Sequence, residues 1–452
     1  MTARHTPASK AAATMSSTLP AWLWWTVGLF SAAMLALQFS IYGHGTDAFD
    51  GYSYFRAWDT ITSLHTDQLR PPVYPIFVGI LSDLFGKNAT LIIIPIIQWT
   101  VYALSMQLVW SLCRSLGVRR GLAIAAVFFF LMFPGMWMHN NLTIPEPLCG
   151  SGLLLLAWLT ERYIQRDSRK ELLWSCALVI CLIFTKVMYI FLIPVMAVVW
   201  IYVCRRRGAL KALTAAAVIV PVVLPLLYSL CNRHTYLHQG LTLASTWNEY
   251  YCLRMEGLIR PDDIRDPGLR ERVAVLTDAD PGRWAPGENI YRSEVEYFNW
   301  TELSEIVDDA VAARPGEVLK MRALYLLRTL PHSSFLIMEP TYDPEARTLQ
   351  QWNGYTYHPA AGYIYPFHRH IWFPVWVAWL VIILFSISWL RKRKKGDFPL
   401  LPFMIAASAA VGYGGILMTA PDDWGRLMTS LNYFLPIMAA SAATRFLNPR
   451  NV

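Results

Sequence analysis

Charged residues are scarce in this sequence of 452 residues, because Asp, Glu, Lys and Arg together make up only 15% of it. Hydrophobic residues make up 55%, and aromatic residues alone 14%. A soluble globular domain usually has about a quarter of its residues charged. The composition therefore excludes an ordinary soluble protein and indicates a polytopic membrane protein.

Cysteine is also sparse, and none of the seven cysteines has the spacing of a metal site. His358, His368 and His370 are too loosely spaced to predict a zinc site. Only Cys231 and Cys252 could meet outside the apolar runs, so they are the one candidate disulfide. The N-terminal segment has no small-residue cleavage site after its apolar run, so we expect it to remain as an anchor.

Acidic residues are almost absent from the interiors of the apolar runs. A secondary transporter needs charged groups within several spans that line its substrate path, so this scarcity argues against that class. A membrane protein that binds a lipid carrier or polymerises a glycan stays open, because it too needs cations at one membrane face.

Apolar runs of about 20 residues predict the membrane spans. One of them, 172–204, is too long for one straight span and has basic residues at both ends. We expect it to form two short helices that turn near Thr185 and Lys186, which gives about ten spans. The runs are 20–41, 89–112, 121–138, 147–163, 172–204, 211–231, 371–390, 399–419 and 427–444.

The positive-inside rule gives an orientation for these spans. One side has about four times as many Lys and Arg residues in its short loops as the other. Both termini are therefore predicted to be cytoplasmic, and we expect an integral protein of a bacterial inner (plasma) membrane. The net charge of +8 follows from this asymmetry, so no nucleic-acid partner is needed to explain it.

Three domains follow from the pattern. Residues 1–231 form a transmembrane catalytic module, 232–370 form a mainly helical extracytoplasmic lobe, and 371–452 form the C-terminal transmembrane helices. The lobe is too long for a plain connection and carries segments with helical spacing. We expect it to lie on the acceptor side.

The first outer segment carries two carboxylates, Asp47 and Asp50, before a turn that reads RPPVYP. Asp50, Tyr54 and Ala57 have the spacing of one helix face, which predicts an amphipathic helix on the membrane surface. The prolines of the turn prevent a regular helix from starting before Val73.

Four charged residues outside this helix fall on the same predicted face: Glu146, Lys186, Arg70 and Arg426. Each has a plainer reading, because Glu146 could only offset a helix dipole, Lys186 could extend its ammonium to the interface, and Arg426 could pair with a loop aspartate. We group these four residues because all of them are predicted to lie at the same membrane face. Carboxylates beside several cations suit a displacement in which one carboxylate takes a proton and the cations hold a departing phosphate.

Aromatic residues are dense at the end of the lobe, where they suit either sugar stacking or a membrane-interface belt. The candidates for the acceptor side are Trp352, Tyr355, Tyr357 and His358.

Four motifs in order resemble the GT-C superfamily of glycosyltransferases, which includes protein O-mannosyltransferases and lipid A aminoarabinose transferases. The motifs cover about the first 205 and the last 35 residues, and the lobe is not covered. They are DGYSY with RPPVYPIFVGIL, then LTIPEPLCGSGLLLLAWL, LVICLIFTKVMYIFLIPV and DDWGRLMTSLNYFLPIMAA.

The resemblance implies an all-α GT-C-like fold and transfer of a sugar, with inversion, from a polyprenyl-phosphate donor to a hydroxyl of a protein, lipid or glycan. It implies Asp50 as the base, with Asp47 in reserve. Arg426, Lys186 and Arg70 would bind the phosphate, and Glu146, Tyr54 and His139 would orient the substrate. A divalent cation held through Glu146 is left open, because Gly51 stands where many relatives have Glu.

Overall fold

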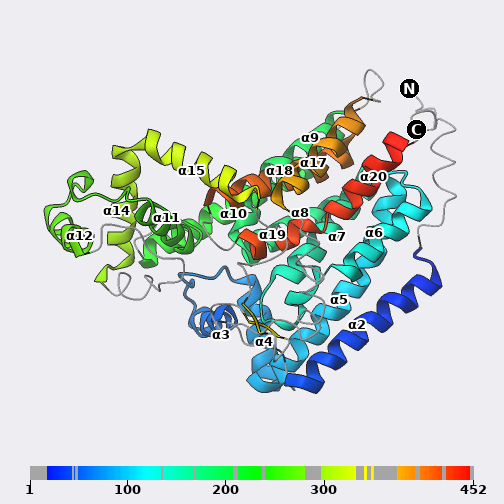
Figure 1. Ribbon diagram of the computed structural model, residues 1–452, viewed down its shortest axis with the longest axis horizontal. Coiled ribbons are helices and arrows are strands. Elements are labelled where there is room, and N and C mark those ends of the chain that lie inside the picture. The colour runs from blue at the N-terminus through cyan, green and yellow to red at the C-terminus, as the bar shows by residue number, and fades with distance from the viewer. Residues whose placement is uncertain are drawn as a thin grey trace.

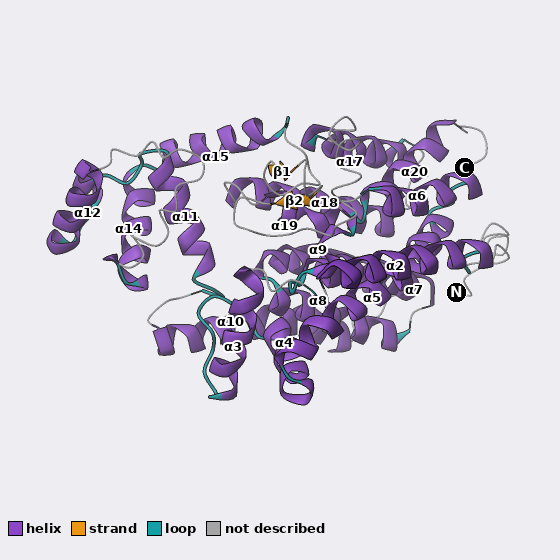
Figure 2. Cartoon of the chain, turned by 60° about the horizontal axis from the view of Figure 1, so that its bottom comes forward, coloured by secondary structure: helices purple, strands orange, loops and turns teal. Residues whose placement is uncertain are grey.

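The computed structural model of the chain is built almost entirely of helices (Figures 1 and 2). In the part that it describes, the exception is a two-stranded antiparallel hairpin of β1 (Thr341–Asp343) and β2 (Thr348–Gln350). The structure describes residues 18–42, 45, 49–133, 136–166, 168–206, 212–236, 240–279, 297–331, 341–343, 348–350, 374–391, 398–419 and 424–447.

Each apolar run predicted as a span contains at least one helix. The structure thus confirms an all-α fold of the polytopic membrane type, with five helices both long and apolar enough to cross a bilayer by themselves among the described residues. The helices of this membrane module are α2 (Ala21–Tyr42), α5 (Lys87–Ser115), α6 (Arg120–Met132), α7 (Glu146–Arg166), α8 (Arg169–Thr185), α9 (Leu192–Arg206), α10 (Ala212–Tyr236), α17 (Val375–Leu390), α18 (Leu400–Thr419), α19 (Trp424–Asn432) and α20 (Leu435–Leu447).

The break predicted within 172–204 is present. Helix α8 ends at Thr185, Lys186 has an extended backbone, and a short 3-10 helix η3 (Val187–Phe191) leads into α9. The last predicted span, 427–444, is likewise divided into α19 and α20. Pro436, in the first turn of α20, has no N–H to donate to the preceding turn, which suits the start of a new helix there.

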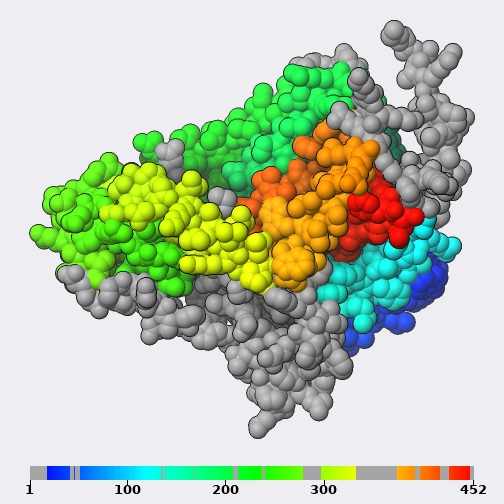
Figure 3. All heavy atoms as spheres, turned by 45° about the horizontal axis from the view of Figure 1, so that its top comes forward, coloured from blue at the N-terminus to red at the C-terminus, as the bar shows by residue number. Residues whose placement is uncertain are grey.

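A separate lobe follows α10. It consists of α11 (Ala244–Met255), η4 (Pro261–Asp263), α12 (Pro267–Ala279), α14 (Trp300–Ala313) and α15 (Pro315–Thr329). Its helices match the segments predicted from helical spacing, and they enclose an apolar core of their own. Figure 3 shows the lobe, green to yellow, projecting from one end of the module.

The predicted disulfide between Cys231 and Cys252 is wrong. Both cysteines are free, and they differ in environment: Cys231 is exposed on α10, whereas Cys252 is fully buried inside the lobe. Cys252 accepts a hydrogen bond from the Arg322 guanidinium at 3.7 Å. The sequence pattern of α11 turns this cysteine into the core of the lobe, away from the end of α10.

The core of the module is rich in aromatic rings that meet edge to face. Trp99 meets Tyr102 at 5.6 Å between ring centroids, and Phe130 meets Tyr433 at 5.2 Å. The Tyr102 hydroxyl donates to the carbonyl of Phe130 at 2.7 Å, so its polar end is satisfied within the apolar interior. These contacts join α5, α6 and the start of α20.

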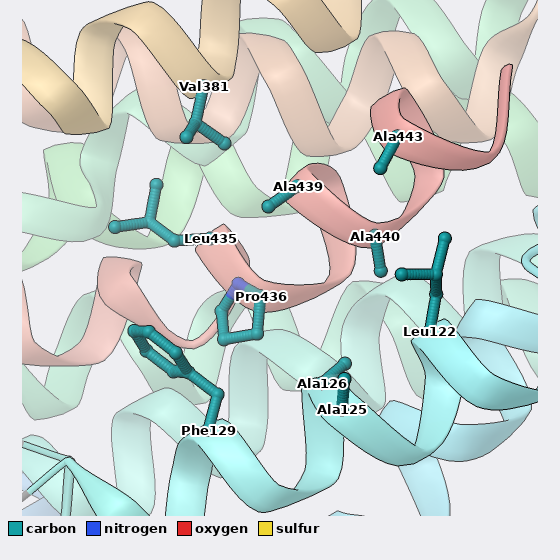
Figure 4. Close-up of a pocket in the computed structure, with 10 residues that line it drawn as sticks. All are labelled: Leu122, Ala125, Ala126, Phe129, Val381, Leu435, Pro436, Ala439, Ala440 and Ala443. Atoms are coloured by element: carbon teal, nitrogen blue, oxygen red, sulfur yellow. The ribbon is translucent and has the colours of Figure 1, made fainter. Parts of the chain in front are cut away.

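A groove with a volume of about 280 Å³ lies on the surface of the module, between α6, α17 and α20 (Figure 4). It is lined by apolar side chains only, among them Leu122, Phe129, Val381 and Pro436, with alanines of α6 and α20. None of the candidate site residues lines it. The groove therefore has no group that could bind a phosphate or a sugar hydroxyl.

Candidate active site

The first outer segment forms a helical hairpin of α3 (Phe49–Thr62) and α4 (Val73–Phe85). The Trp58 indole N–H donates to Asp83 Oδ2 at 3.0 Å and ties the two helices together. Gly79 permits their close approach, because a Cβ atom there would lie 2.1 Å from the Trp58 ring. The predicted surface helix is thus held in place by its own partner helix.

Asp50 lies in the first turn of α3, one helical turn before Tyr54, so the two belong to the same helix face. Tyr54 and Ala57 are directed into the protein, since Tyr54 is 2% exposed and Ala57 is fully buried. Tyr54 packs edge to face on Tyr74 of α4, with 4.7 Å between ring centroids. Asp47 lies outside the described residues, two positions after Gly45.

Arg70 is tied to the same face of α3. Its Nε donates to the Ser53 hydroxyl at 2.7 Å, and its guanidinium lies 4.8 Å from the Tyr54 ring centroid. The Asp67 carboxylate fixes the preceding turn by accepting hydrogen bonds from the backbone N–H groups of Leu69 and Arg70. The cation proposed from sequence therefore lies beside Tyr54, near the helix that carries Asp50.

Glu146 and Lys186 form an ion pair, with 2.5 Å between Nζ and Oε1. Glu146 is the first residue of α7 and its side chain is only 1% exposed, while the Lys186 side chain is 17% exposed at the end of α8. The helix break at Lys186 brings the ammonium to the start of α7. Burying either charge alone would be costly, so each residue accounts for the other's position.

Two tyrosines, Tyr74 and Tyr189, flank this ion pair. Tyr74 interacts electrostatically with Tyr54, Glu146 and Cys149, which places it between α3 and α7. On the other side, Tyr189 of η3 donates from its hydroxyl to Ser430 Oγ of α19 at 2.5 Å. Sequence reasoning missed Tyr74 and Tyr189, although Tyr74 stands inside the RPPVYP motif.

Arg426 lies in the first turn of α19, four residues before Ser430, which contacts η3. The contacts thus run continuously from α3 to α19, through Tyr54, Tyr74, Glu146, Lys186, Tyr189 and Ser430. Asp50 lies one turn beyond one end of this series, and Arg426 one turn beyond the other. Residues that are 376 positions apart in the sequence are brought to one end of the bundle.

The loop before α7 is buried throughout. His139, predicted to orient substrate, is 1% exposed in the 3-10 helix η2 (Met138–Asn141). The loop is fixed from two directions, because the Gln98 amide donates to the Ile144 carbonyl at 2.8 Å and Gly45 lies against Asn141. His139 therefore lies in the same segment as Glu146, close to the start of the first outer segment.

The predicted acceptor residues lie outside the described residues, namely Trp352, Tyr355, Tyr357 and His358. Within the described ranges, no group of three His, Cys, Asp or Glu side chains could hold a metal ion. The arrangement that the structure does describe offers a carboxylate–ammonium pair, neutral hydroxyls and an arginine at the junction of α3, α4, α7 and η3. Such a set can bind a phosphate and a polyhydroxyl compound together.

Residues 69–229 match the family model described as dolichyl-phosphate-mannose-protein mannosyltransferase. This match to a glycosyltransferase family of the GT-C type confirms the resemblance drawn from the motifs. It includes Arg70, Tyr74, Glu146 and Lys186, and ends within α10. Asp50 and Arg426 lie beyond it. No curated protein sequence matches this chain.

The mannosyltransferase match and the geometry agree on one region of the molecule. The matched segment contains the Glu146–Lys186 pair and both tyrosines that flank it. The lobe is outside the match, as it was outside the sequence resemblance. The match therefore lies within the membrane module.

Proposed function

We propose that the protein transfers a sugar from a polyprenyl-phosphate-linked donor to a hydroxyl acceptor, at the extracytoplasmic face of the membrane. The observation that carries this proposal is the buried Glu146–Lys186 pair, with Asp50 in the first turn of α3 and Arg426 in the first turn of α19. The mannosyltransferase match makes polyprenyl-phosphate mannose the first donor to test.

In the proposed reaction, Asp50 takes the proton of the acceptor hydroxyl, and the hydroxyl oxygen attacks the anomeric carbon. The bond from that carbon to the phosphate oxygen breaks, and the polyprenyl phosphate leaves with its electron pair. One displacement inverts the anomeric configuration. A base positioned in this way contributes about 10² to 10⁴-fold to the rate.

Lys186, Arg70 and Arg426 supply positive charge where the phosphate leaves. Lys186 is the best supported of the three, because the ion pair with Glu146 fixes its ammonium in a largely buried place, where charge acts strongly. Arg70 is tied to Ser53 and Tyr54, so its main effect would be to hold α3 and Asp50 in position.

The distribution of arginines supports an extracytoplasmic position of the site. Arginines cluster at the bundle end away from α3, among them Arg114, Arg119, Arg166, Arg205 and Arg391. The positive-inside rule favours a cytoplasmic position for that end, which supports a site and a lobe on the opposite side. The lobe would then lie where it could select a protein, lipid or glycan acceptor.

The sharpest test is Asp50→Asn in the purified full-length protein, given polyprenyl-phosphate mannose and followed by release of polyprenyl phosphate. We expect turnover to fall at least about 100-fold. Asp59→Asn is the matched control, because Asp59 is an exposed residue of the same helix. Near-normal turnover in Asp50→Asn would remove it as the base.

The same assay distinguishes a transferase from a protein that only binds a lipid carrier and from a glycan polymerase or ligase. If wild-type protein binds the donor in a thermal-shift measurement but releases no polyprenyl phosphate with any tested acceptor or with water, the protein binds a lipid carrier and does not consume it. Consumption of a monosaccharide-phosphate lipid supports the transferase, whereas consumption of only a diphosphate-linked glycan indicates a polymerase or ligase.

A further inference from the structure

Three buried polar side chains of the segment that matches the family model are without hydrogen-bond partners in the part of the chain that the structure describes. They are Tyr74, Asn140 and Asn141. Tyr74 is 2% exposed, and both asparagines are fully buried. In each asparagine both the amide nitrogen and the amide oxygen lack a partner.

Such groups need an explanation, because most buried polar atoms in native proteins are hydrogen-bonded. A buried amide without partners lowers the free energy of unfolding, and two in succession are unusual. Asn232, 2% exposed, differs from them: its Oδ1 also lacks a partner among the described residues, but its amide N–H group donates to the carbonyls of Gly240 and Leu241 at 2.8 and 3.2 Å. The difference points to a missing ligand near η2.

The positions of these three side chains indicate which kind of ligand they could bind. Tyr74 lies between Tyr54 of α3 and Glu146 of α7, within the series of contacts that joins Tyr54 to Lys186. Asn140 and Asn141 belong to η2, which contacts α5 and α7 and precedes Glu146 by a few residues. Tyr74 is therefore near the buried carboxylate, the two asparagines lie in the segment that leads to it, and all three are within the matched segment.

The three side chains are uncharged, which distinguishes them from the cations of the site. Phosphate is best held by Lys and Arg, which are present as Lys186, Arg70 and Arg426. A hydroxyl and two amides instead offer donors and acceptors in equal measure, and so does each hydroxyl of a sugar. Beside them, a carboxylate can accept a hydrogen bond from a sugar hydroxyl.

We propose that Tyr74, Asn140 and Asn141 form the hydroxyl-binding side of a hexose subsite, in which the donor sugar is recognised next to Glu146. This inference rests on the proposed function. Its consequence is specificity: a site that hydrogen-bonds a hydroxyl discriminates strongly against a donor that presents that hydroxyl differently, because its own polar groups are then left unpaired.

The test compares wild type with Tyr74→Phe and with Asn140→Ala/Asn141→Ala, using three probes: polyprenyl-phosphate mannose, polyprenyl-phosphate glucose and polyprenyl phosphate alone. Wild type should prefer one of the two epimeric sugar lipids. Each variant should lose at least about tenfold of that preference in kcat/KM. The extra rise in Tm that the preferred sugar lipid gives over polyprenyl phosphate should also disappear.

Two further measurements make the result decisive. Binding of polyprenyl phosphate alone should be unchanged in the variants, because the cations remain. Without any ligand, the variants should be as stable as wild type or more so, since each loses unpaired polar atoms. The controls Tyr102→Phe and Asn232→Ala, which remove a hydroxyl and an amide N–H that donate hydrogen bonds elsewhere, should lose stability and keep the sugar preference.

The outcomes distinguish this inference from the proposed function. If wild type neither binds nor consumes any sugar lipid, the proposed function fails. If wild type transfers sugar and the variants keep the full preference, or if their loss of Tm equals that of the controls, the three side chains are structural or water-bound and the subsite is overturned.

Discussion

The membrane module and the lobe use charge in opposite ways. The lobe surrounds its small apolar core with ion pairs, including Arg265 with Asp309, and Arg314 with Asp263 at 2.6 Å. The described part of the module has a far larger apolar core, and Glu146 pairs with Lys186 in its interior. The lobe thus has ion pairs around its core, whereas the module has an ion pair with a fully buried carboxylate.

The difference follows from the surroundings of each part. At the lobe surface, water solvates the arginines, so each pair adds little and many are needed. In the module a buried charge without a partner costs several kcal/mol, so few are kept. A buried pair in the module is therefore stronger evidence of function than a series of pairs in the lobe.

The largest effect should come from Glu146→Gln and Lys186→Met. Either change alone leaves the other charge buried and unpaired, which should destabilise the protein by about 3–5 kcal/mol and lower turnover at least about 100-fold. The double variant should recover much of the stability and none of the activity. Thermal unfolding and donor turnover measure the two effects; recovered activity in the double variant would show that the pair is only structural.

A smaller effect is expected from Gly79→Ala, which adds a methyl group where the Trp58 ring lies. The ring must move, its hydrogen bond to Asp83 is lost, and α3 with Asp50 shifts. We expect about 1–3 kcal/mol of destabilisation and roughly tenfold lower turnover. Gly28→Ala on α2 is the control, because a Cβ there meets nothing within 4 Å; equal effects of both changes would contradict this explanation.

The smallest effect on activity should come from the lobe. Burial of Asp309 opposes its ionisation, yet the hydrogen bonds from the Arg265 side chain and backbone outweigh it and lower the carboxyl's pKa below the ordinary 3.8. Since the folded pKa is the lower one, this stabilisation is present above pH 3.8 and is lost as the pH falls below it.

Asp309→Asn should therefore lower stability by about 1–3 kcal/mol at pH 7 and leave turnover with polyprenyl-phosphate mannose nearly unchanged. Unfolding followed by tryptophan fluorescence from pH 7 to pH 3 measures this. The stability of wild type should fall toward that of the variant at the acid end. A large loss of turnover at pH 7 would instead connect the lobe to the chemical step.

Much of the fold could be predicted because the length of an apolar run and the basic residues at its ends are properties of a single segment. The runs predicted as spans contain helices, and the turn at Lys186 followed from a run too long for one helix with basic residues at both ends. The proposed disulfide failed for the opposite reason. It depended on where two distant cysteines point, and the pattern of α11 buries Cys252 inside the lobe.

By itself, the sequence determined the membrane class, the order of the helices and which charges share a side, since each depends on the composition of a single segment. Only the tertiary structure decided that Lys186 pairs with Glu146, that Tyr189 joins η3 to α19, and that Tyr74, Asn140 and Asn141 are buried with no hydrogen-bond partner among the described residues. These are contacts between segments far apart in the chain. They depend on how the helices pack, which no single segment specifies.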